Sequence, residues 1–162
     1  MTRIFIDADA CPVKDEVYRV AVRYNLGVFV VSNRLIAVPD QPGIERIVVD
    51  AGPDVADDWI AERAGAGDVV ITADIPLAAR CVANKASVLE PKGRELDGDA
   101  IGMALAVRNL MDDLRSTGTI TTGSAPFSKA DRSTFLSALD RIVVRLRKSV
   151  RVTPPRPPAG GW

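Results

Sequence analysis

The chain has 162 residues, with 21 basic residues, 21 acidic residues and no histidine. A sequence without histidine excludes Ser-His-Asp and Cys-His catalysis, a histidine general base and a histidine-ligated zinc site. Proton transfer would therefore fall to Asp, Glu, Lys, Cys, Tyr or metal-bound water. The length predicts a single domain over residues 1–150, with an aliphatic core because only 5% of the residues are aromatic.

The composition also predicts a cytoplasmic protein. Cys11 and Cys81 are too few for a disulfide framework and lack CxxC spacing, which is typical of a reducing compartment. No apolar run approaches the roughly 18 residues of a membrane span, and the first residues enter a strand rather than a signal peptide. We therefore expect no association with membranes. Residues 151–162 contain four prolines and two glycines, and this composition predicts a disordered tail.

Short apolar runs and stretches with helical periodicity alternate along the chain. The apolar runs predict strands at residues 3–6, 28–31, 47–49, 69–71 and 86–89. The helical patterns predict helices at about residues 12–26, 52–66, 76–84, 99–115 and 129–148, and Ser128 with Asp131 forms the pattern of a capping box before the last helix. The alternation predicts an α/β fold in which helices cover both faces of a mostly parallel sheet of about five strands.

The charges are unevenly distributed although the net charge is zero. Residues 1–107 contain 11 Lys and Arg against 17 Asp and Glu, a net charge of −6, whereas residues 108–162 have a net charge of +6. A metal site beside a polyanion-binding surface would require this arrangement. A C-terminal helix with a basic, solvated face explains the same pattern, and both interpretations stay open.

Acidic residues follow three of the predicted strands, at the edge where open parallel sheets bind ligands. These residues are Asp7 and Asp9 after the first strand, Asp54, Asp57 and Asp58 in the helix after the third strand, and Asp74 at the end of the fourth strand. Carboxylates that converge on one point repel each other and therefore need a cation. Oxygen ligands without His or Cys favour Mg²⁺ or Mn²⁺ over zinc.

Helix geometry ranks the acids of the middle group. Asp54 and Asp57 are three residues apart and would share one helix face, and Asp57 borders the apolar stripe while Asp58 lies on the opposite flank. We therefore rank Asp57 first, Asp54 second and Asp58 third as metal ligands. The three acids would also complement the helix dipole without any metal, and Asp9 is equally well placed to cap the next helix.

Five motifs stand in a fixed order along the chain. They are residues 7–12 (DADACP), 54–57 (DVAD), 71–78 (ITADIPLA), 91–93 (PKG) and 122–132 (TGSAPFSKADR). Together they resemble the YaiI/YqxD family of bacterial proteins over residues 3–148. That family is similar to the PIN-like nucleases, so the resemblance implies a three-layer α/β/α domain whose acidic side chains hold Mg²⁺ or Mn²⁺ at the strand ends.

The resemblance implies that Asp7, Asp57 and Asp74 are the catalytic, metal-holding residues, with Asp9 and Asp54 as supporting ligands. The expected function is a Mg²⁺- or Mn²⁺-dependent nuclease acting on RNA or single-stranded nucleic acid. The ion would orient a water and neutralise charge on the phosphate, which needs no histidine. Basic residues would hold the phosphodiester backbone, and the candidates are Lys92, Arg108, Lys129, Arg132, Arg141 and Arg145.

Two other functions stay open. Asp7-x-Asp9 after a first strand is also typical of haloacid-dehalogenase-like phosphatases, in which the first Asp is the nucleophile and the second is a general acid. In this chain Cys11 stands where such enzymes have a hydroxyl residue. A non-catalytic nucleic-acid-binding or regulatory module would keep the same acidic pocket. Whether the chain forms an oligomer of identical copies is open as well.

Overall fold

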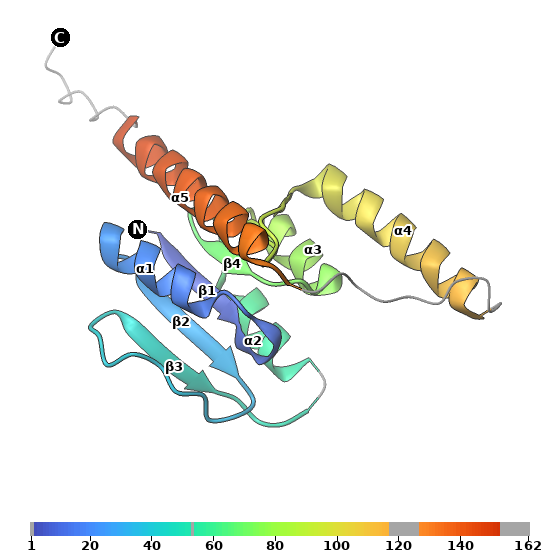
Figure 1. Ribbon diagram of the computed structural model, residues 1–162, viewed down its shortest axis with the longest axis horizontal. Helices are drawn as coiled ribbons and strands as arrows, with labels where there is room; N and C mark the ends of the chain where they lie inside the picture. Colours follow the sequence, from blue (N-terminus) through green and yellow to red (C-terminus); the bar gives the residue numbers. More distant parts are fainter. Residues whose placement is uncertain (1, 53, 117–126, 153–162) are drawn as a thin grey trace, which may run out of the picture.

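Six strands form one sheet at the centre of the computed structural model, which describes residues 2–52, 54–116 and 127–152 (Figure 1). The order across the sheet is β3-β2-β1-β4-β5-β6. The strands are β1 (Arg3–Asp7), β2 (Gly27–Ser32), β3 (Ile44–Val48), β4 (Val69–Ile71), β5 (Ser87–Leu89) and β6 (Glu95–Leu96). Neighbouring strands are parallel except β5 and β6, which are antiparallel.

β1 lies in the middle of the sheet because both of its faces are apolar. Ile4, Phe5 and Ile6 are fully buried. Ile4 and Ile6 pack into the core on one side of the sheet, and Phe5 packs into the core on the other side. Strands of parallel sheets are covered on both faces and are therefore continuous apolar runs. This confirms the interpretation of the first strand.

The helices form one layer on each side of the sheet (Figure 1). In chain order they are α1 (Lys14–Tyr24), α2 (Val55–Arg63), α3 (Ile75–Ala83), α4 (Gly98–Ser116) and α5 (Lys129–Val152), with a short 3-10 helix, η1 (Ala8–Ala10), after β1. Buried residues of α1 and α5 pack together on one face, and those of α2, α3 and the start of α4 pack on the other. The predicted α/β fold is therefore confirmed, and α4 extends away from the sheet in Figure 1.

The structure differs from the sequence predictions in four main respects. The sheet has six strands rather than five, because β6 pairs with β5 through only two residues. The first helix begins at Lys14 after the separate turn η1, and it ends because Asn25 adopts a left-handed conformation. α2 begins at Val55, so Asp54 precedes the helix rather than lying in its first turn. α5 continues to Val152, and the rest of the predicted tail lies outside the described residues.

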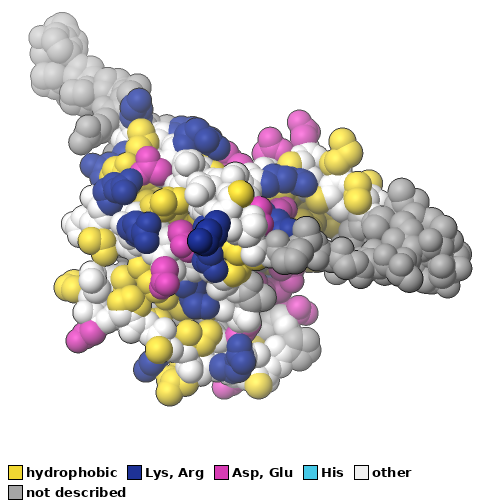
Figure 2. Space-filling model, in the orientation of Figure 1, with side chains coloured by type: hydrophobic (Ala, Val, Ile, Leu, Met, Phe, Trp, Pro, Cys, Tyr) yellow, Lys and Arg dark blue, Asp and Glu magenta, His cyan; other side chains and the backbone are white. Residues whose placement is uncertain are grey.

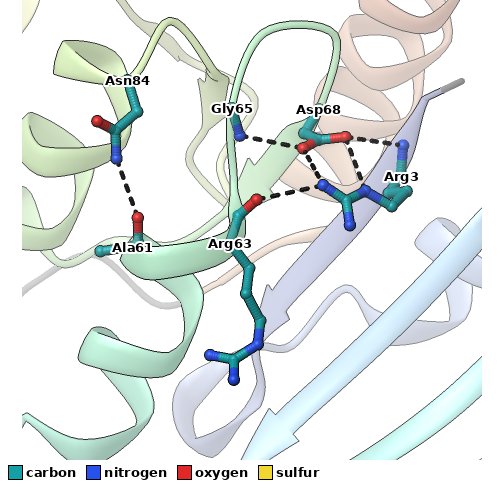
Figure 3. A network of polar contacts seen from close by, with 6 residues as sticks. All are labelled: Arg3, Ala61, Arg63, Gly65, Asp68 and Asn84. Carbon is teal, nitrogen blue, oxygen red and sulfur yellow. Dashed lines mark hydrogen bonds and ion pairs between the residues drawn. The ribbon is translucent and has the colours of Figure 1, made fainter.

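A polar network holds together the amino-terminal ends of the central strands β1 and β4 (Figure 3). The guanidinium of Arg3 donates to both carboxylate oxygens of Asp68, at 3.2 and 2.8 Å. Asp68 is almost fully buried and also accepts the backbone N–H of Gly65 at 3.0 Å. A buried carboxylate needs such partners, and these join the start of β1 to the loop before β4. The predicted acids lie at the opposite ends of the strands, the carboxyl-terminal ends.

Within the described residues, no helix is long and apolar enough to cross a membrane. Cys11 and Cys81 are free thiols inside the protein. Burial raises the pKa of each thiol to about 11. Both cysteines therefore behave as small core residues rather than as reactive thiolates near neutral pH.

Candidate functional site

The strand order predicts a ligand-binding crevice between the carboxyl ends of β1 and β4. After β1 the chain passes to α1 on one face of the sheet, and after β4 it passes to α3 on the other face. Connections that leave two adjacent strands in opposite directions open a crevice between them, which is where open α/β sheets bind ligands. Asp7 ends β1, and Asp74 follows β4. The sheet topology thus brings these two predicted residues to the same crevice.

A buried hydroxyl links Asp7 to Asp74. Thr72 Oγ1 donates to Asp7 Oδ2 at 3.0 Å and accepts the backbone N–H of Asp74 at 3.0 Å. Asp74 in turn caps α3, because its Oδ1 accepts the N–H of Leu77 at 3.0 Å. Each carboxylate oxygen has two lone pairs, so both groups keep acceptor capacity for another ligand. Thr72 therefore fixes the relative position of the two carboxylates.

The strand on the other side of β1 repeats this arrangement. Ser32, at the end of β2, is fully buried, donates from Oγ to Asp9 Oδ1 and accepts the N–H of Arg34 at 3.0 Å. Thr72-x-Asp74 and Ser32-x-Arg34 are thus equivalent turns on β4 and β2, the two neighbours of β1. Each supplies one hydroxyl to a carboxylate that follows β1. These contacts position Asp7 and Asp9 in different directions along the same edge.

The third predicted carboxylate, Asp57, lies in the first turn of α2. Burial raises the pKa of Asp57 to about 6, with further contributions from the charges of Asp74, Asp7 and Asp54, while Arg80 opposes the shift. Electrostatic coupling of this kind requires the carboxylates to be near each other. Asp54 contributes as an exposed residue in a left-handed conformation before α2. The structure therefore brings the charges of all four acids to bear on one region.

The pKa of Asp7 is raised as well. Burial is the main cause, the Thr72 hydrogen bond opposes it, and the charges of Asp74 and Asp9 add to it. A cation would relieve this repulsion, and an all-oxygen donor set suits Mg²⁺ or Mn²⁺. As the side chains lie, however, no three acidic or thiol groups among the described residues are arranged to hold a metal ion. The donor chemistry fits such an ion, whereas the side chains would have to turn to ligate it.

Asp58 faces a different partner. It forms an ion pair with Arg80 across α2 and α3, at 2.7 Å. Both side chains are about half exposed. This contact joins the two helices that carry Asp57 and Asp74, and it turns Asp58 toward a guanidinium rather than toward the other acids.

Two of the predicted phosphate-binding arginines are held by acids of the same chain. Arg132 donates to Glu16 at 3.1 Å and to the carbonyl of Pro12 at 2.7 Å. Arg145 forms a two-pronged ion pair with Glu95, at 3.2 and 2.7 Å. These contacts attach α5 to α1 and to β6. Part of the basic charge of the C-terminal helix therefore serves its packing against the acidic body of the domain.

The other predicted basic residues are spread over the surface. Lys129 and Arg141 are exposed on α5, and Lys92 is exposed in the turn between β5 and β6. The side chain of Arg108 lies outside the described residues. Figure 2 shows basic side chains over the face formed by α1 and α5, with acidic side chains between them.

Three polar residues at this edge were not singled out from the sequence: Thr72, Ser32 and Arg34. The available signal was a hydroxyl residue at the end of a buried strand, two positions before a charged residue. Such residues commonly accept the backbone N–H two residues later. The pattern predicts the local turn. It does not predict the carboxylate that accepts the hydrogen bond from the hydroxyl, because that carboxylate comes from the end of another strand.

Comparison with known proteins identifies the family. A family model described as "Uncharacterized BCR, YaiI/YqxD family" matches residues 5–145. A UPF0178 protein of Gluconacetobacter diazotrophicus is 72% identical over 148 residues, which cover 91% of this chain and 96% of that protein. A UPF0178 protein of Azorhizobium caulinodans is 61% identical, over 90% of this chain and 92% of that protein. One of Gluconobacter oxydans is 58% identical, over 91% of this chain and 84% of that protein. No solved structure matches the chain. The chain belongs to the YaiI/YqxD family.

Proposed function

We propose that the protein is a metal-dependent phosphodiesterase that cleaves RNA or single-stranded nucleic acid at the crevice between β1 and β4. The observation that carries the proposal is the Thr72 hydroxyl, which donates to the carboxylate of Asp7 and accepts the backbone N–H of Asp74. The charges of both acids also raise the pKa of Asp57 in α2. Mutually repelling carboxylates at a functional edge of the sheet are costly unless they bind a cation. The motifs resemble the YaiI/YqxD family, and the similarity of that family to the PIN-like nucleases supports the same function.

Asp7, Asp57 and Asp74 would hold Mg²⁺ or Mn²⁺, with Asp9 and Asp54 beside them. Such an ion lowers the pKa of a coordinated water and neutralises charge that develops on the phosphate. The protein supplies the orientation: Thr72 fixes the carboxylate of Asp7, and the helix cap fixes the carboxylate of Asp74. Because Thr72 also accepts the backbone N–H of Asp74, a shift of the segment after β4 would move both acids together.

The test is an assay of the purified protein with Mn²⁺ on single-stranded RNA, single-stranded DNA and a small phosphate ester. We expect cleavage of a polynucleotide that requires the metal and falls about a hundredfold or more in Asp7→Asn, while binding is retained. Asp58→Asn is the matched control, since this carboxylate pairs with Arg80, and it should retain cleavage.

The other outcomes identify the alternatives. Hydrolysis of the small ester without any action on polynucleotides would overturn the proposal in favour of a phosphatase with Asp7 as nucleophile. Nucleic-acid binding that is equal in EDTA and never leads to cleavage would instead indicate a binding module.

A further inference from the structure

An open groove lies beside the carboxylate crevice, between the segment after β1 and the loop after β2. Its volume is about 520 Å³, and its lining includes Asp9, Pro12, Lys14, Arg34 and Ile36. This volume is in the range of small-ligand sites. Ala8 and Asp9 of its lining follow Asp7 directly in the sequence, so the groove begins next to the end of β1.

Arg34 places a largely unused guanidinium in the groove. About 70% of its side chain is exposed, and its Nε lies 3.9 Å from Asp9 Oδ1. That distance is too long for a hydrogen bond, and an exposed ion pair of this length contributes little energy. The backbone N–H of Arg34 is nevertheless held by Ser32 at 3.0 Å. The guanidinium is therefore exposed and weakly paired, while the backbone that carries it is fixed.

Lys14 supplies a second cation from the first residue of α1. Its Nζ donates to the carbonyl of Cys11 at 3.0 Å, which uses one of its three donors. With Lys14, Arg34 and Asp9 the groove has an excess of one positive charge. Pro12 and Ile36 add apolar surface to the same lining. The groove thus combines cations for a phosphate with an apolar wall for a flat, uncharged group.

We infer that this groove binds the nucleotide next to the reacting phosphodiester, with Arg34 and Lys14 on its phosphate and Pro12 and Ile36 against its base or ribose. The inference rests on the proposed function and assigns its substrate as a single strand. An unstacked base reaches an apolar wall, whereas a base within a duplex stays stacked on its neighbours. A guanidinium fork matches phosphate oxygens better than a point charge does.

The experiment measures the affinity of the protein for a labelled single-stranded RNA of roughly ten nucleotides, a length within the usual range for such sites, in EDTA and over a series of salt concentrations. Arg34→Ala should weaken binding about tenfold and reduce the slope of log affinity against log salt by about 0.7. Arg34→Lys should keep most of that slope, because the charge is retained.

The control removes an arginine at the end of α1 that lies away from Lys14. Arg23→Ala loses an exposed contact to Asp140 and should leave affinity and slope close to the wild-type values. Duplex RNA of the same sequence should bind more weakly and should not respond to Arg34→Ala. Lys14→Ala provides a second groove variant, and thermal unfolding of each variant shows that it is folded.

The possible results separate the two proposals. Equal losses in Arg34→Ala and Arg23→Ala, or no loss in Arg34→Ala and Lys14→Ala, overturn the groove assignment while Mn²⁺-dependent cleavage still supports the nuclease. A wild-type protein that binds the single strand through Arg34 but never cleaves it supports the groove and refutes the catalytic function. A wild-type protein that binds no single strand at low salt overturns both.

Discussion

Two carboxylates at and just after the end of β1 are each positioned by a buried hydroxyl group. Thr72 and Ser32 are both buried, and each both accepts a backbone N–H and donates to an acid, Asp7 or Asp9. A hydrogen bond to a charged group contributes about 1.5 to 3 kcal/mol, more than one between neutral groups. At the scale of the residue, therefore, the site depends on two short side chains that bear no charge themselves.

The charge of Asp57 makes the stability of the protein depend on pH. Burial and neighbouring acids raise its pKa from 3.8 to about 6, so the folded chain binds this proton more tightly than the unfolded chain does. The free energy of unfolding consequently falls as the pH rises from about 4 to about 6. We expect Asp57→Asn to raise that free energy by about 1 kcal/mol at neutral pH, after discounting for solvent exposure, and to change it little near pH 4.

Urea unfolding of both proteins at the two pH values measures this difference. Asp58→Asn serves as the control, because it removes an acid of the same helix that has a cationic partner; it should not stabilise the protein at either pH. An Asp57→Asn variant less stable than the wild type at neutral pH would contradict the account of a repulsive carboxylate cluster.

At the scale of the element, the turn between β5 and β6 depends on a glycine. Gly93 has φ of 96°, and a Cβ built on it would lie 2.9 Å from the backbone nitrogen of Phe135 in α5. The PKG motif therefore has a packing role: it lets α5 approach the sheet edge. We expect Gly93→Ala to lower the free energy of unfolding by about 2 kcal/mol or more, through both strain and the clash.

Gly67→Ala isolates the backbone part of this effect. Gly67 also has positive φ, at 88°, but no atom lies within 4 Å of a Cβ built there. Gly67→Ala should therefore lower the free energy of unfolding by about 1 kcal/mol. Equal losses of stability in the two variants, measured by urea unfolding, would show that α5 does not press on Gly93.

The elements differ in how far the sequence alone predicts them. β1 and β4 were predictable, because a buried strand is a continuous apolar run. β6 was not, because Glu95 and Leu96 carry no periodicity and form a strand only by pairing with β5. The partners of Arg132 and Arg145 were not predictable either, because they lie on distant segments of the chain: Arg132 and Glu16 are 116 positions apart.

At the scale of the whole molecule, part of the positive charge of the C-terminal region is paired with acids of the N-terminal region. Acids of α1 and β6 neutralise arginines of α5, while Asp7 and Asp74 at the strand ends accept hydrogen bonds from Thr72 and Leu77. Sequence reasoning identified the acidic residues at the strand ends, because their type and place follow from the α/β pattern. It did not identify the cationic groove, because Lys14 and Arg34 meet only when β1 and β2 lie side by side.

Thermal unfolding in a Mn²⁺ titration measures whether the carboxylates at the ends of β1 and β4 bind a divalent cation. Mn²⁺ at a hundred times its dissociation constant should add about 2.7 kcal/mol, a rise in Tm of roughly 5 to 10 °C for a chain of this length. Asp7→Asn and Asp74→Asn should lose this rise, the latter while keeping a residue that caps α3. Asp58→Asn should retain it. A wild-type protein with no rise, or a rise that survives in Asp7→Asn and Asp74→Asn, would contradict the account.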